Sequence, residues 1–267
     1  MSYKFKNIRD FNSYVHGLYE NFERNPDYAI MEALTGAGRG AEIRNRRAFE
    51  SYKELKLESG KVIQVKEILD RMAVAKNTFK AKFRSMNAII DNLVTIYCVN
   101  DPAIKTMATD NHRLYVNPVF VSELSNEEIV FVMLHECLHV VYNHPEALLD
   151  LSRQNHLRAH YADAYEVNST IGRNGLMGKE SMSLSDGVEH SEKIMTNMKA
   201  VYKTKYIGYT ARQIYKMLEN EPIPPEYKSA WNDLVDGEPK DDENQNGGQG
   251  GGQQQEGGQQ QQGQGGG

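Results

Sequence analysis

The stretch that decides the fold is SNEEIVFVMLHECLHVVYNHP, residues 125–145. It opens with Ser125 and has Glu128 three positions later, which is the capping-box pattern of a helix start. An uninterrupted apolar run follows, and Pro145 disfavours a continuing helix because proline lacks a backbone N–H donor and restricts the residue before it. The sequence therefore predicts one helix from residue 126 to about residue 144.

Two histidines of that helix, His135 and His139, are four positions apart, with Glu136 beside the first. At 3.6 residues per turn the two histidines lie about 40° apart around the axis, and Glu136 lies about 100° from His135. This spacing lets two imidazoles bind one zinc ion, with the glutamate as general base on the bound water. The alternative is a pair of helix histidines without a metal, which the helix signals around them make less favourable.

A catalytic zinc site needs a third protein ligand and one open position for water. His144 is the nearest candidate, but nine residues from His135 on a continuous helix it points to the opposite side, so it reaches the site only if Asn143 and His144 already leave the helix. Residues 159–168 predict a second helix, on which Asp163 and Glu166 share a face. Either carboxylate completes the site while the other hydrogen-bonds a ligand histidine. The sequence leaves Asp163 and Glu166 open as the third ligand, with His144 less favoured.

The remaining elements predict an α+β fold that is mainly helical. Apolar residues at helical spacing indicate helices within 3–34 and one long helix over 61–92. A β-branched run at 93–99, and the segments 104–108 and 113–116 around a turn, predict a small antiparallel sheet just before the zinc helix. The edge of such a sheet is a place where an extended peptide adds as another strand.

Composition divides the chain into three predicted parts: a helical N-terminal region at 1–60, a metal-site domain at 61–235, and a Gln/Gly-rich tail at 236–267. The tail contains almost no apolar residues, so we expect it to be disordered. The only two cysteines, Cys98 and Cys137, lie in apolar runs and indicate free thiols in a reducing compartment.

The net charge of −5 without a dominant basic block argues against nucleic acid as the main partner. The sequence contains no apolar stretch long enough to cross a bilayer, and its first residues lack the pattern of a signal peptide. We therefore expect a cytoplasmic protein with no membrane partner.

Several segments, taken together, resemble the putative metallopeptidase domain of bacteria and their phages: 107–118, 124–128, 135–139, 144–145, 162–168 and 208–215. The resemblance covers about residues 86–218 and implies a zincin-like fold. In that family a pattern like Ala-Asp-x-x-x-Asn follows the zinc helix. Here Asp163 lies five rather than four residues before Asn168, and Ala164 holds the expected place. Members often carry a von Willebrand A-like domain, which we expect to be absent because the Gln/Gly tail follows.

These observations predict a zinc-dependent metallopeptidase, with Zn²⁺ held by His135, His139 and Asp163 or Glu166, and with Glu136 as the catalytic base. The expected substrate is a protein or peptide, and an ATPase or a von Willebrand A-like protein is the expected kind of partner. The competing prediction is a non-catalytic, zinc-stabilised binding or adaptor module. A closed four-ligand site would favour it, because no position would remain for water.

Overall fold

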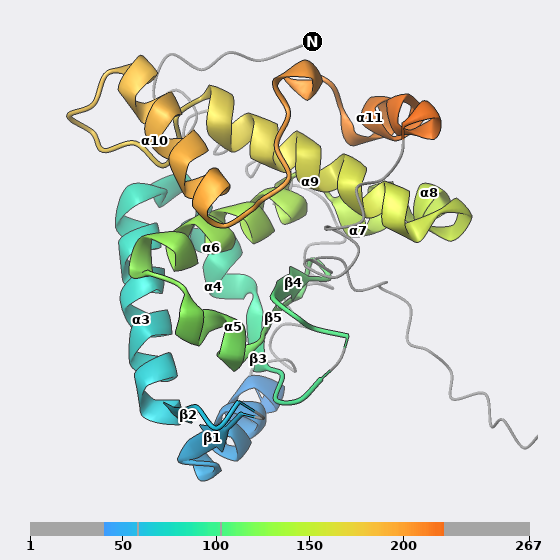
Figure 1. Ribbon diagram of the computed structural model, residues 1–267. Coiled ribbons are helices and arrows are strands. Elements are labelled where there is room, and N and C mark those ends of the chain that lie inside the picture. Colours follow the sequence, from blue (N-terminus) through green and yellow to red (C-terminus); the bar gives the residue numbers. More distant parts are fainter. Residues whose placement is uncertain (1–39, 58, 102, 222–267) are drawn as a thin grey trace, which may run out of the picture. The chain divides into compact units, whose positions relative to one another are not determined.

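The computed structural model describes residues 40–57, 59–101 and 103–221 (Figure 1). The helices predicted within 3–34 and the tail predicted at 236–267 lie outside the described residues. All described residues belong to one unit of the chain, Met1–Gly237. Among them, no helix combines the length and the apolar character needed to cross a bilayer.

The described part begins with a helix at 40–51, followed by the antiparallel strands β1 (Glu54–Lys56) and β2 (Val62–Gln64). Phe49 of the helix and Ile63 of β2 are both buried in one hydrophobic cluster. Residues on both sides of the position predicted to separate 1–60 from 61–235 therefore contribute to the same core.

The single long helix predicted over 61–92 is wrong. That range contains β2, then α3 (Val65–Lys82), the 3₁₀ turn η1 (Arg84–Met86) and α4 (Asn87–Asn92). Helix α3 ends because Phe83 has non-helical dihedral angles, φ −115° and ψ 62°, with its side chain fully buried near Phe79. Buried residues recur through all of these elements, so apolar spacing alone did not reveal the breaks between them.

A three-stranded sheet follows, with β3 (Val94–Tyr97), β4 (Met107–Thr109) and β5 (Arg113–Val116) in the order β3-β5-β4. Strands β4 and β5 pair antiparallel around a turn in which Asn111 has φ 73°. The predicted α+β class with a small sheet is confirmed. The antiparallel arrangement holds for β4–β5 and β1–β2, whereas β3 pairs parallel with β5, so the larger sheet is mixed.

Both outer strands of this sheet are already engaged. The side chain of Asn45 accepts from the backbone N–H of Tyr97 in β3 and donates to its carbonyl. All three residues of β4 are fully buried. A peptide that added to either strand would therefore have to displace existing contacts.

Helix α6 (Asn126–Val141) begins as predicted: Ser125 accepts a hydrogen bond from the N–H of Glu128, and the Glu128 carboxylate accepts from the N–H of Ser125. It follows the short α5 (Pro118–Glu123) and packs against α3, β4 and α9. Every residue from Ile129 to His139 is buried. This helix is therefore the central element of the core, and its histidines lie away from bulk water.

The C-terminal half is helical, with α7 (His144–Ala147), α8 (Leu149–Gln154), α9 (His156–Arg173), α10 (Leu184–Asn197) and α11 (Ala211–Met217), and with the short turns η2 (Thr204–Tyr206) and η3 (Leu218–Asn220). Helix α9 packs against α6, α8, α10 and α11 (Figure 1). Its Val167 and Ile171 belong to the cluster around α6, whereas its Tyr161 and Tyr165 belong to a second cluster that includes Ile214 of α11. Helix α9 thus links α6 to α11.

Candidate metal centre

Helix α6 brings the rings of His135 and His139 together. Their Nε2 atoms are 2.9 Å apart, and both side chains are almost completely buried. Glu136 is fully buried next to them. The helical spacing of four residues therefore converges two nitrogen donors on one point, as the sequence predicted.

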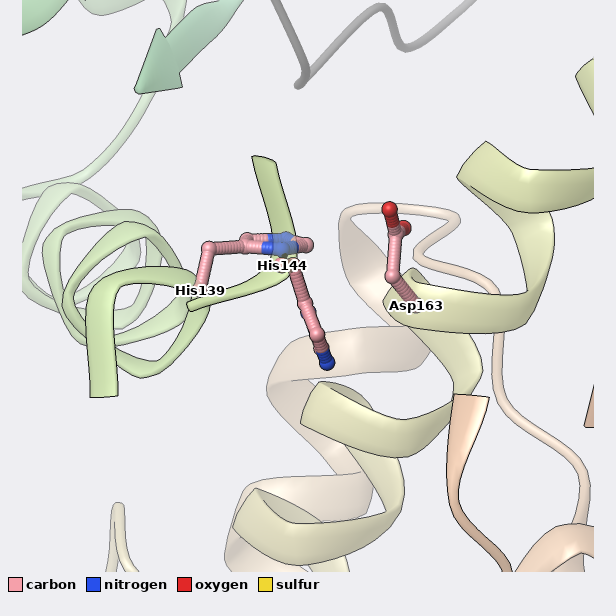
Figure 2. Close-up of side chains that lie close together, drawn as sticks. All are labelled: His139, His144 and Asp163. Carbon is pink, nitrogen blue, oxygen red and sulfur yellow. Dashed lines mark hydrogen bonds between the residues drawn. The ribbon is translucent and has the colours of Figure 1, made fainter. Parts of the chain in front are cut away.

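His144 lies beside His139, because the chain leaves the helix before His144, which is the one case in which the sequence allowed this ring to reach the site. Helix α6 ends at Val141 rather than near residue 144, and Asn143 adopts the left-handed conformation with φ 53° and ψ 39°. Asparagine tolerates that conformation better than most residues. The chain therefore reverses, and the Nδ1 atoms of His139 and His144 come within 3.0 Å (Figure 2).

Helix α9 supplies the two candidate acids, and they lie in different places. Asp163 is fully buried, and its carboxylate forms a group with His139 and His144 in which the three ligand atoms are within 4.8 Å of one another (Figure 2). Glu166 lies on the other ring nitrogen of His144: its Oε2 is 3.2 Å from His144 Nε2 and accepts from the backbone N–H of Ala211 at 2.6 Å. His135 is not part of the group of three that these described residues form.

Asn168, also on α9, holds the ring of His135. Its Nδ2 donates to the carbonyl of Val201 at 2.8 Å, so its Oδ1 must be the atom that lies 2.9 Å from His135 Nδ1. An amide oxygen only accepts, so His135 Nδ1 carries the ring proton in this bond and the neutral ring presents the Nε2 lone pair towards His139. Ligand histidines in metal sites are commonly held in this way. The residue patterns alone gave Asn168 no role, because the α6–α9 packing creates the contact.

The donor set is suited to a metal ion. Burial, together with the neighbouring His135, His144 and His160, lowers the pKa of His139 well below its usual value, so this ring is neutral and keeps a lone pair. His160 itself is buried, with Nδ1 3.9 Å from the Asp163 carboxylate. Neutral imidazoles combined with one carboxylate are the nitrogen and oxygen ligands that zinc and similar transition metals prefer.

Of three comparisons with known proteins, one agrees with this chemistry. A search of curated proteins and a search of solved structures each found no match. A family model described as "Putative metallopeptidase domain" matches residues 80–267, a range that includes every residue of the metal centre. Because the match spans more than half of the chain, the protein belongs to this metallopeptidase domain family.

Proposed function

We propose that the protein is a zinc-dependent metallopeptidase in which His135, His139 and Asp163 hold the ion and Glu136 is the general base. The observation that supports this most directly is the Nε2–Nε2 distance of 2.9 Å between two buried rings, one of which has its tautomer set by Asn168. The family to which the chain belongs supports peptide hydrolysis as the reaction.

Asp163 is a better third ligand than Glu166 because of what each carboxylate already contacts. Glu166 Oε2 interacts with His144 Nε2 and with the N–H of Ala211. A carboxylate oxygen of Asp163 lies within 4.8 Å of a ring nitrogen of His139 and of one of His144. His144 has its two ring nitrogens directed to His139 and to Glu166. We therefore assign His144 to the support of His139 and leave the third position to Asp163.

A bound zinc ion would supply a Lewis acid that polarises a carbonyl and acidifies water. Glu136 follows His135 on α6 and is fully buried. In the proposed reaction its carboxylate takes a proton from the attacking water and passes it to the nitrogen of the leaving amine. No nucleophilic serine or cysteine is then required, and burial raises the pKa of Cys137, which keeps that thiol protonated.

Replacing the base tests this proposal. Glu136→Gln should keep its zinc, measured by elemental analysis, and lose about 10²- to 10⁴-fold of the hydrolysis of unfolded casein. Glu67→Gln is the matched control, because Glu67 is an exposed acid on α3 outside the metal centre. Undiminished hydrolysis by Glu136→Gln would remove Glu136 from the mechanism.

A second function, a metal-stabilised binding module, is favoured by two observations. His144 lies with His139 and Asp163, so that a fourth protein donor is close to the ion. The residues of β4, the outer strand next to α6, are fully buried, so among the described residues this strand is not open to a substrate. X-ray absorption of the zinc-loaded protein separates the two functions: four protein ligands with no hydrolysis would favour the binding module, and three with an open position would favour the peptidase.

A further inference from the structure

We propose that Glu166 is a positioning residue that acts on the metal centre through His144. It fixes which nitrogen of His144 carries the proton, and His144 in turn holds His139 with Nε2 turned towards His135. This inference rests on the proposed function for His139 as a ligand, and it assigns to Glu166 a role distinct from binding the ion.

The contacts form a continuous chain across four segments of the structure. The backbone N–H of Ala211, at the start of α11, donates to Glu166 Oε2 on α9 at 2.6 Å. The same oxygen lies 3.2 Å from Nε2 of His144, whose side chain is 3% exposed. The other nitrogen of that ring, Nδ1, lies 3.0 Å from Nδ1 of His139. The Glu166 carboxylate, whose side chain is 17% exposed, thus reaches His139 through one intervening imidazole.

The positions of the protons follow from the carboxylate end. An ionised carboxylate accepts hydrogen bonds and cannot donate one, so His144 Nε2 must carry a proton. When the His144 ring carries only this proton, its lone pair is on Nδ1, and His139 Nδ1 is then the donor between the two rings. This places the His139 lone pair on Nε2, which faces His135.

The lone pair of His135 also lies on Nε2, and here the contact with Asn168 sets the tautomer. Asn168 and Glu166 therefore direct the Nε2 lone pairs of His135 and His139 at each other across 2.9 Å. Two lone pairs that face each other repel, and a cation bound by both nitrogens would relieve this repulsion. Asn168 and Glu166 therefore orient the two Nε2 atoms so that both can bind one ion.

The experiment measures the proton positions directly in the metal-free protein, by long-range ¹H–¹⁵N NMR of the histidine rings. In the wild type, His144 should carry its proton on Nε2. In Glu166→Ala this preference should be lost, and zinc affinity, measured by competition with a chromophoric chelator, should fall about 10- to 100-fold. Glu166→Gln should retain the tautomer and most of the affinity, because the amide oxygen can accept from both donors.

Two controls separate positioning from a general structural role. Arg212→Ala removes the contacts of α11 with Asp150 and with the carbonyl of Ala147 without touching an imidazole. It should lower the unfolding temperature and leave the His144 tautomer unchanged. His135, which Asn168 anchors, is the internal reference, and it should keep its proton on Nδ1 in every variant.

An unchanged His144 tautomer in Glu166→Ala would overturn the proposal, and so would the same tautomer change in Arg212→Ala. If Glu166→Ala does not fold, His144→Phe tests the next step: zinc affinity should fall by a similar factor while His135 keeps its tautomer, and unchanged affinity would overturn the proposal. The tautomer is measured without metal or substrate. An inactive wild type would therefore contradict the peptidase function and leave this test valid.

Discussion

The two histidines of α6 are held in contrasting ways. His135 is anchored by the uncharged amide of Asn168 on α9, which itself donates to the backbone carbonyl of Val201. His139 is anchored through a second histidine to the carboxylate of Glu166, and this chain also needs the turn at Asn143 and the first N–H of α11. Two histidines of one helix can therefore depend on very different amounts of tertiary structure.

The largest effect should come from removing the ring that takes part in both nitrogen pairs. His139→Ala breaks the Nε2 contact with His135 and the Nδ1 contact with His144, whereas His135→Ala breaks only the first of these. Structural zinc sites with four ligands bind the ion with a free energy of roughly 10–16 kcal/mol, or about 3 kcal/mol per ligand. Loss of one ligand should therefore lower zinc affinity on the order of a hundred-fold. Isothermal titration with zinc should show at least this loss for both variants and the greater loss for His139→Ala. His190→Ala, which changes an exposed contact with Glu127, is the control.

Equal losses for the two histidine variants would indicate that the contact of His139 with His144 contributes nothing to metal binding. His135 and His139 would then differ in their contacts and not in their contribution to zinc affinity.

The second-largest effect should come from removing the metal. An ion that binds only the folded protein stabilises it by about 2.7 kcal/mol when its concentration is 100 times its Kd. For a domain of this size that corresponds to roughly 5–10 °C in the unfolding temperature. Differential scanning calorimetry with zinc, and again after chelation, should show this shift in the wild type and not in His139→Ala. A shift of the same size in that variant would place the ion elsewhere on the protein.

Asn168→Ala should have a smaller effect at the His135 end. The substitution leaves the ring without its acceptor and the carbonyl of Val201 without the Asn168 donor. Loss of an outer contact of this kind typically reduces metal affinity about 10- to 100-fold. The buried carbonyl should also lower the free energy of unfolding by about 1–3 kcal/mol, measured by urea denaturation. An affinity within two-fold of the wild type would show that His135 orients itself without the amide.

The parts of the molecule that the sequence predicted correctly are those with local signals. The start of α6 follows from Ser125 and Glu128, which contact each other within one helical turn. The approach of His135 to His139 follows from helix geometry alone. The β4–β5 pair was found from its turn residues, whereas nothing local to β3 indicates that it pairs parallel with β5.

The rest of the site depends on contacts between distant segments. The different surroundings of Asp163 and Glu166 could not be predicted from their shared helix, because the partner of Glu166, Ala211, lies 45 residues further along the chain. His144 was misplaced because the predicted helix continued through Asn143. An asparagine shortly before a proline was a usable signal that the helix ends earlier, since asparagine tolerates the left-handed conformation.

The smallest predicted effect comes from changing the turn at Asn143. Asn143 has φ 53°, and its side chain accepts from Asn111 and donates to Glu146. Asn143→Gly and Asn143→Ala both lose these hydrogen bonds, but only alanine also resists the left-handed backbone, at a cost of about 1–2 kcal/mol. We therefore expect Asn143→Ala to be less stable than Asn143→Gly by about 1 kcal/mol in urea denaturation. It should also bind zinc more weakly, because the left-handed turn at residue 143 brings His144 into contact with His139. Equal stability and equal zinc affinity in the two variants would show that the backbone reversal at residue 143 does not hold His144 in place, and the His139 end would then depend on Glu166 alone.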